Sequence, residues 1–347
     1  MLLVLFLFPN LKAGKNATVA VYDDEGCWQD GIIAFEKFLN WKRIGHHRIS
    51  GADIKNGELT NDKYAIVFFP GGMAYDFFKR IGFGGVRKIR DFVNDGGGYL
   101  GICAGAYFAS DSVTWEGEKI DAVLSLFDGT AVGSLKKIIP WDQYTLTGIS
   151  VKKNNPSAKY LLPSYSTLYY GGPAFYVHEG VDIDTLATWN GYNDAPAIIN
   201  FEYGKGRVFL SGAHLEIEEN SIRDGQNFAG ELDDPETEWD ILWAAVDWLL
   251  KREITNIPLA VNHHIDTDDY LVTVRNAFII FSLPASQERI ASIDVYNFAG
   301  QKVAGEISPQ LSSPNTIIIL RNGLPVGIYF FIVNTGRKFL TGKFIIQ

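Results

Sequence analysis

Residues 98–109 read GYLGICAGAYFA, and this stretch predicts a short buried strand that turns sharply into a helix at Cys103. Glycines stand two residues before and two residues after the cysteine. Small residues are needed there if the chain is to make the strained strand-to-helix turn called a nucleophile elbow. The helix N-terminus then directs partial positive charge at the sulfur and favours its thiolate form. Cysteine is also a common small buried apolar residue, so the motif alone is equally compatible with an unreactive thiol in the core.

A second strand ends in glycines that could serve the same site. Residues 65–72, AIVFFPGG, predict a β-strand that stops at a proline–glycine–glycine turn. Glycines just past a strand allow backbone N–H groups to approach a ligand closely. Together with the N–H of Ala104, those of Gly71 and Gly72 would form an oxyanion hole.

A hairpin in the second half of the chain supplies a base and a group to orient it. Residues 203–216, YGKGRVFLSGAHLE, predict a glycine-containing turn followed by a strand that delivers His214 and Glu216. A cysteine, a histidine and a glutamate form a set of nucleophile, base and orienting carboxylate.

These motifs resemble the class I glutamine-amidotransferase-like superfamily, and within it the family of the biotin-protein ligase N-terminal domain. The resemblance implies that Cys103 is the nucleophile, His214 the base and Glu216 its orienting group. The His-Pro-Glu of the superfamily is His-Leu-Glu here, which keeps both functional side chains. The resemblance does not identify a substrate. The resemblance covers roughly residues 17–252 and rests on the His214/Glu216 pair and on residues 21–24, 69–72, 97–107 and 170–173.

Several other residues are expected at the rim of this site. The loop after the first strand contains Asp24, Glu25 and Cys27, and it would share one edge of the sheet with the elbow. Cys27 could then form a disulfide with Cys103. Asp24 or Glu25 could instead hydrogen-bond the Cys103 sulfur, or Asp24 could simply cap a helix. The remaining expected rim residues are Tyr107, Tyr170, Gly171 and Gly172.

Alternating strand and helix patterns predict an α/β fold, a flavodoxin-like doubly wound, mostly parallel sheet with helices on both faces. Strands are expected over 17–22, 64–69, 165–170, 187–189 and 197–201, and helices over 30–41, 86–94 and from 235 to about 252. From residue 270 onward only strands and turns are predicted, which indicates a small antiparallel β-sandwich. The expected domains are a signal peptide over 1–14, the α/β domain over 15–252, a linker over 253–267 and the sandwich over 268–347.

The sandwich resembles the type IX secretion C-terminal sorting domain of Bacteroidetes-type bacteria. Residues 293–303, 323–331 and 342–347 carry the resemblance. It implies export across the outer membrane, with the secretion machinery as a partner of residues 268–347, and a secreted or cell-surface protein. The alternative is a generic sandwich that binds carbohydrate or packs on the first domain.

Composition and local sequence patterns limit the partners, cofactors and membrane segments that we expect. A net charge of −9 over 347 residues makes a nucleic-acid partner unexpected. The apolar run over 1–9 is too short to span a membrane and suits a signal peptide, with a buried first strand as the alternative; no later transmembrane segment is expected. No cofactor or metal is expected, because the His and Asp residues over 263–269 match no ligand spacing. The acidic stretch over 217–238 predicts a solvated loop, with an acidic rim that selects cationic substrates as the alternative.

Two functions remain from the sequence. The first is an exported Cys-His-Glu thiol hydrolase that acts on an amide, peptide or ester, and takes a small molecule or peptide as substrate. The second is a non-catalytic ligand-binding or surface protein on the same scaffold. The reactivity of Cys103 discriminates between them.

Overall fold

The central sheet has nine strands and changes character in its middle. It is parallel across its first five strands and antiparallel across the rest. In sheet order the strands are β2 (Gly45–Ile49), β1 (Thr18–Tyr22), β3 (Ile66–Phe69), β4 (Gly98–Ile102), β13 (Gly206–Ser211), β12 (Pro196–Tyr203), β11 (Asp184–Trp189), β8 (Thr145–Val151) and β9 (Ser164–Tyr169).

The computed structural model describes most of the first 251 residues and part of the remainder. The expected signal peptide and residues 253–263 of the expected linker lie outside the described residues. Those described are 18–121, 124–179, 181, 183–218, 224–232, 237–251, 264–266, 271–274, 278–283, 290–297, 300–303, 316–320, 324–325 and 327–346.

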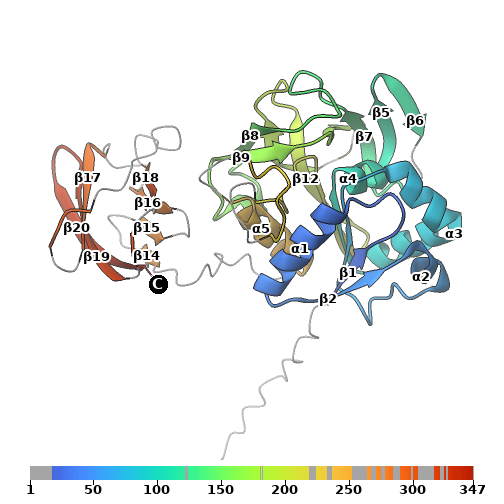
Figure 1. The fold of residues 1–347 in the computed structure, drawn as a ribbon, viewed down its shortest axis with the longest axis horizontal. Coiled ribbons are helices and arrows are strands. Elements are labelled where there is room, and N and C mark those ends of the chain that lie inside the picture. The colour runs from blue at the N-terminus through green and yellow to red at the C-terminus, as the bar shows by residue number, and fades with distance from the viewer. Residues whose placement is uncertain are drawn as a thin grey trace, which may run out of the picture.

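Helices cover both faces of the sheet, because successive side chains of each buried strand point to opposite sides. In β1, Val19 and Val21 enter one core, and Ala20 and Tyr22 enter the other. The first core is closed by α1 (Gln29–Trp41) and α5 (Trp239–Leu249). The second is closed by α2 (Gly51–Asn56), α3 (Ala74–Asn94) and α4 (Ala104–Ala109), as Figure 1 shows. The predicted α/β fold is therefore confirmed.

Two sequence expectations about these elements were wrong. Helix α3 begins at Ala74, well before the expected start at residue 86, and continues across a kink at Gly82. Phe77 and Ile81 extend the buried face of the helix to the N-terminal side of the kink.

The acidic stretch is also less solvated than expected, because Glu218, Asp224 and Glu238 are buried. The backbone N–H of Glu218 donates to Asp224 Oδ2 at 3.0 Å, and Thr237 donates to the Glu218 carboxylate. These carboxylates are therefore part of the packed domain and do not form an acidic rim.

A smaller four-stranded sheet stands beside α4. Its order is β10 (Ala174–Val177), β7 (Phe127–Gly133), β5 (Ser110–Trp115) and β6 (Glu118–Asp121). Helix α4 leads directly into β5. One turn of 3₁₀ helix, η1 (Pro156–Ala158), follows β8.

The C-terminal residues form two antiparallel sheets that face each other. One contains β14 (His264–Asp266), β15 (Leu271–Val274), β16 (Phe278–Ser282) and β18 (Thr316–Leu320); the other contains β17 (Ser292–Asn297), β19 (Gly327–Asn334) and β20 (Phe339–Ile346). The ring of Phe281 in the first sheet contacts those of Phe331 and Phe344 in the second, with centroids 5.0 and 5.9 Å apart. The predicted sandwich is confirmed.

Candidate active site

The chain turns directly from β4 into α4 at Cys103. The backbone there has φ 49° and ψ −106°, a conformation that L-residues rarely adopt. A Cβ at residue 101 would lie 2.7 Å from the carbonyl oxygen of Gly105, and a Cβ on Gly105 would lie 2.2 Å from that of Phe69. The G-x-C-x-G spacing thus follows from backbone crowding on both sides of the elbow.

His214 and Glu216 follow the end of β13 and form a buried pair. His214 Nδ1 lies 2.9 Å from Glu216 Oε1, and the side chains are 1% and 0% exposed. The His214 backbone N–H donates to Leu168 O of β9 at 3.0 Å. The Trp239 indole N–H donates to the Glu216 carbonyl oxygen at 3.0 Å. Both ends of the pair are therefore anchored to regular structure.

The imidazole of His214 packs beside Cys103. A Cβ on Gly71 would lie 2.8 Å from His214 Cε1 and 3.7 Å from Cys103 Cβ, so all three groups meet at one point. The Trp28 ring packs edge-to-face on His214 at 4.8 Å. The Cys103 thiol donates to Tyr170 O at 3.5 Å, and His214 Nε2 is buried without a hydrogen-bond partner in the described part of the chain.

The charge state of His214 is set by its surroundings. Burial alone lowers the pKa of the imidazole, because it penalises the charged form. The Glu216 carboxylate and the Cys103 sulfur act in the opposite direction and raise the His214 pKa to about 10. The site therefore favours an imidazolium, which is the form that stabilises a neighbouring thiolate.

The predicted oxyanion donors lie around the elbow. Gly72 and Ala104 line the cavity at Cys103, whereas Gly71 packs directly on His214. Within the described residues, no acceptor pairs with the backbone N–H groups of Gly71, Gly72 or Ala104. Of these residues, Gly72 and Ala104 line the cavity, and Gly71 is buried behind it.

A cavity of about 870 Å³ opens over Cys103 and His214. Of the expected rim residues, Cys27, Tyr107, Tyr170 and Gly171 line it. Its other lining residues are Gly26, Trp28, Gly72, Met73, Ala74, Tyr75, Phe78, Ala104, Phe108, Val113, Trp115, Ile120, Asp121 and Trp141. We call this the Cys103 cavity.

The other expected rim residues lie elsewhere. Asp24 accepts hydrogen bonds from Arg80 Nε at 2.8 Å and from the Gly51 N–H at 2.9 Å. Glu25 lies 3.8 Å from Arg80 Nη1. Gly172 packs on the Gly212 carbonyl, where a Cβ would come within 1.9 Å.

The two cysteines are free thiols although both line the cavity. The Cys27 thiol donates to Tyr22 O at 3.7 Å and accepts from the Asp24 N–H at 3.5 Å. Burial raises the pKa of Cys27 to about 12, so this sulfur is held as an unreactive thiol. The potential nucleophile in this cavity is therefore Cys103.

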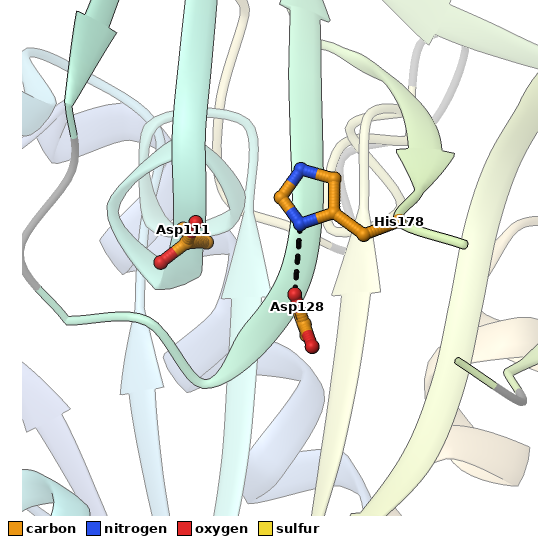
Figure 2. Close-up of side chains that lie close together, drawn as sticks. All are labelled: Asp111, Asp128 and His178. Atoms are coloured by element: carbon orange, nitrogen blue, oxygen red, sulfur yellow. Dashed lines mark hydrogen bonds and ion pairs between the residues drawn. The ribbon is translucent and has the colours of Figure 1, made fainter. Parts of the chain in front are cut away.

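Sequence reasoning missed most of the aromatic wall, which comes from segments spread between residues 28 and 141. It also missed three exposed side chains that β-pairing brings together: Asp111 of β5, Asp128 of β7 and His178 after β10 (Figure 2). Their potential ligand atoms lie within 4.8 Å of one another, and His178 Nδ1 lies 2.8 Å from Asp128 Oδ1. Because all three are solvent-exposed, we treat them as a surface ion-pair cluster.

Comparison with known families identifies two family domains in the chain. Residues 18–273 match the family described as "Biotin-protein ligase, N terminal", and residues 275–347 match the "Secretion system C-terminal sorting domain". The chain belongs to the biotin-protein ligase N-terminal family. Its sorting domain makes it a secreted or cell-surface protein that engages the secretion machinery. None of the helices in the described residues is long and apolar enough to cross a membrane.

Individual relatives cover parts of the chain. A biotin–protein ligase of Schizosaccharomyces pombe is 30% identical over 166 residues, which are 44% of this chain but only 26% of the ligase. An uncharacterized protein of Chlamydia muridarum is 28% identical over 49% of this chain and 67% of its own length. A glutamine amidotransferase of Thermotoga maritima has 13% identity and a TM-score of 0.41, covering 68% of this chain and 99% of its own. That last likeness concerns the fold alone.

Proposed function

We propose that this exported protein is a cysteine hydrolase that cleaves an amide, peptide or ester through a thioester acyl-enzyme. The observation that carries the proposal is the buried His214–Glu216 pair, which lies beside a strained Cys103 at the wall of an open cavity. Strain at a nucleophile and a buried base held by a carboxylate are costly features that serve catalysis.

The proposed reaction uses the three side chains in sequence. The Cys103 thiolate attacks the carbonyl carbon, and His214 donates its proton to the leaving nitrogen or oxygen as that bond breaks. A water molecule then attacks the thioester while His214 accepts its proton. The carboxylic acid leaves and the Cys103 thiolate is restored. Glu216 holds Nδ1 throughout, so that Nε2 is the nitrogen that exchanges protons.

The N–H groups around the elbow would stabilise the tetrahedral intermediates. Those of Gly72 and Ala104 belong to residues that line the cavity next to Cys103. Stabilisation of a developing oxyanion by fixed N–H donors is commonly the largest contribution to acyl-transfer catalysis, at roughly 100- to 1,000-fold per donor.

One observation favours the non-catalytic alternative. The Cys103 thiol contacts the Tyr170 carbonyl oxygen, and His214 Nε2 accepts no hydrogen bond from it. A binding protein could retain such a thiol as part of a ligand pocket. The hydrolase instead requires the Cys103 sulfur to rotate toward Nε2 and pass its proton to His214 already in the substrate-free protein.

Intact-mass spectrometry with p-nitrophenyl acetate tests the proposal. If the protein is a hydrolase, its mass should increase by one acetyl group, and this group should map to Cys103. The mass should return to its starting value as the acyl-enzyme hydrolyses. Cys103→Ala should gain none, and His214→Gln should acylate at least about 100-fold more slowly, because it lacks the imidazolium that holds Cys103 as a thiolate. A Cys27→Ser control should behave as the wild type. If His214→Gln acylates at the wild-type rate, the catalytic reading fails and the binding protein is favoured.

A further inference from the structure

We propose that the Cys103 cavity accepts a bulky, uncharged, apolar acyl group, and that free glutamine and other zwitterionic amino acids are not its substrates. This inference rests on the proposed hydrolase function and names the substrate class of that site. It comes from the chemistry of the cavity wall.

The wall is dominated by aromatic and aliphatic side chains. Eight of its twenty residues are aromatic, and they come from both sides of the elbow: Trp28, Tyr75, Phe78, Tyr107, Phe108, Trp115, Trp141 and Tyr170. Several touch one another edge-to-face; Trp115 packs against Tyr107 and Trp141 with ring centroids 5.6 and 6.4 Å apart. Such a surface gains free energy when an apolar ligand displaces water from it.

Charged groups on this wall are scarce, and one of its hydroxyl groups is already hydrogen-bonded. The Tyr107 hydroxyl donates to Gly171 O at 3.0 Å. Apart from Cys27, Cys103 and His214, whose roles are given above, Asp121 is the one acidic or basic residue of the lining, and it lies on the exposed strand β6. No lysine or arginine lines the cavity in the described part of the chain.

Two basic residues of α3 follow the lining residue Phe78 and form ion pairs outside the lining. Lys79 Nζ lies 2.8 Å from Asp76 Oδ1 and 4.5 Å from the ring centroid of Tyr75 at the mouth, and Arg80 Nε lies 2.8 Å from Asp24 Oδ1. Apart from the His214 imidazolium, which is already paired with Glu216, the carboxylate of a free amino acid would therefore meet no cationic side chain on this wall. Desolvating an unpaired charge in this way is strongly unfavourable.

The mouth of the cavity extends the apolar surface outward. Met73, Tyr75, Ile120 and Trp141 line it and are between 51% and 67% exposed. Large side chains gathered and exposed in this way mark a surface that a ligand covers. A substrate with an extended apolar group would bury them and place its carbonyl carbon at Cys103.

Binding to the Cys103→Ala variant tests this inference without requiring catalysis. The probes are acetamide, hexanamide, octanamide, phenylacetamide and L-glutamine, titrated against tryptophan fluorescence of the full chain. Affinity should rise by roughly fourfold for each added methylene, the factor expected for burying a CH₂ group. Phenylacetamide should bind at least about tenfold more tightly than L-glutamine.

A second variant locates the binding surface. In the Cys103→Ala background, Trp141→Ala should weaken octanamide binding by about tenfold. Trp141 is 54% exposed, so its loss spares the core. The control is Phe339→Ala, an aromatic of the C-terminal sandwich that is 70% exposed, which should leave binding unchanged.

The inference is overturned if L-glutamine binds as tightly as hexanamide, or if affinity does not depend on chain length. It is also overturned if Trp141→Ala and Phe339→Ala have the same effect. Each of these results is independent of whether Cys103 forms an acyl-enzyme with p-nitrophenyl acetate, so failure of the substrate class and failure of the hydrolase are distinguishable.

Discussion

Replacing Gly71 by alanine should disable Cys103 while leaving the fold intact. The added Cβ would lie 2.8 Å from His214 Cε1 and 3.3 Å from Trp28 Cε3. Carbon atoms in contact normally lie about 3.5–4.0 Å apart. The imidazole must therefore move by roughly 0.7 Å or more, or the Gly71 backbone must shift by that amount.

Displacement on this scale should be costly for chemistry and modest for stability. A 1 Å misplacement of a reacting group can reduce the rate about 100-fold, so we expect a loss of that order in acylation of Cys103 by p-nitrophenyl acetate. Overpacking one methyl group should lower the free energy of unfolding by about 1–3 kcal/mol. Stopped-flow release of p-nitrophenol measures the first effect, and urea denaturation measures the second.

Gly84→Ala is the matched control. A Cβ there meets nothing within 4 Å, on an exposed turn of α3. This variant should stabilise the helix by about 1 kcal/mol and acylate at the wild-type rate. The reasoning is refuted if Gly71→Ala acylates within twofold of the wild type, because the packing of Gly71 on His214 would then have no bearing on the reaction.

Three further predictions concern stability and the second thiol. Lys42→Met should lower the free energy of unfolding, measured in urea, by about 3–5 kcal/mol, because it breaks a buried ion pair with Asp247 at 3.1 Å. A double variant that also carries Asp247→Leu should recover most of this loss. If the double variant recovers none of it, the ion-pair argument is contradicted. Since the folded-state pKa of His214 is raised from 6.5 to about 10, its protonation stabilises the fold fully below about pH 6.5 and this contribution is lost as pH rises through about 10. The difference in unfolding free energy between the wild type and His214→Gln should change across that window, and a constant difference would argue against the raised pKa. Thiol titration of the unfolded, unreduced protein should find both Cys27 and Cys103 as thiols, whereas a disulfide would leave neither titratable.

Local sequence patterns predicted the elements that carry the candidate nucleophile. The elbow could be foreseen because its glycine–cysteine–glycine spacing is contiguous in the sequence, although Gly105 itself is required by the carbonyl oxygen of Phe69 on a separate strand. The hairpin of β12 and β13 could be foreseen because its turn residues and alternating pattern are contiguous. Local signals of this kind depend on the chain's own geometry and survive in any tertiary context.

Features that depend on distant contacts were missed. The first part of α3 was not predicted; its buried residues Phe77 and Ile81 belong to the core on one face of the sheet. Glu218 and Asp224 are acidic and read as solvated, yet they are buried because a later segment supplies Thr237 and covers them. The aromatic wall has no linear signature, since Trp28 and Trp141 meet the same cavity only after the sheet has formed.

The most direct test of the central claim is the rate of Cys103 alkylation by iodoacetamide against pH, on reduced Cys27→Ser protein. For an ordinary thiol the rate falls about 100-fold between pH 9.5 and pH 6.5. The thiolate held by the His214 imidazolium should lose less than about tenfold over that range, and His214→Gln should restore the ordinary fall. A fall of about 100-fold in both proteins would contradict a poised nucleophile and leave Cys103 as a pocket residue of a binding protein.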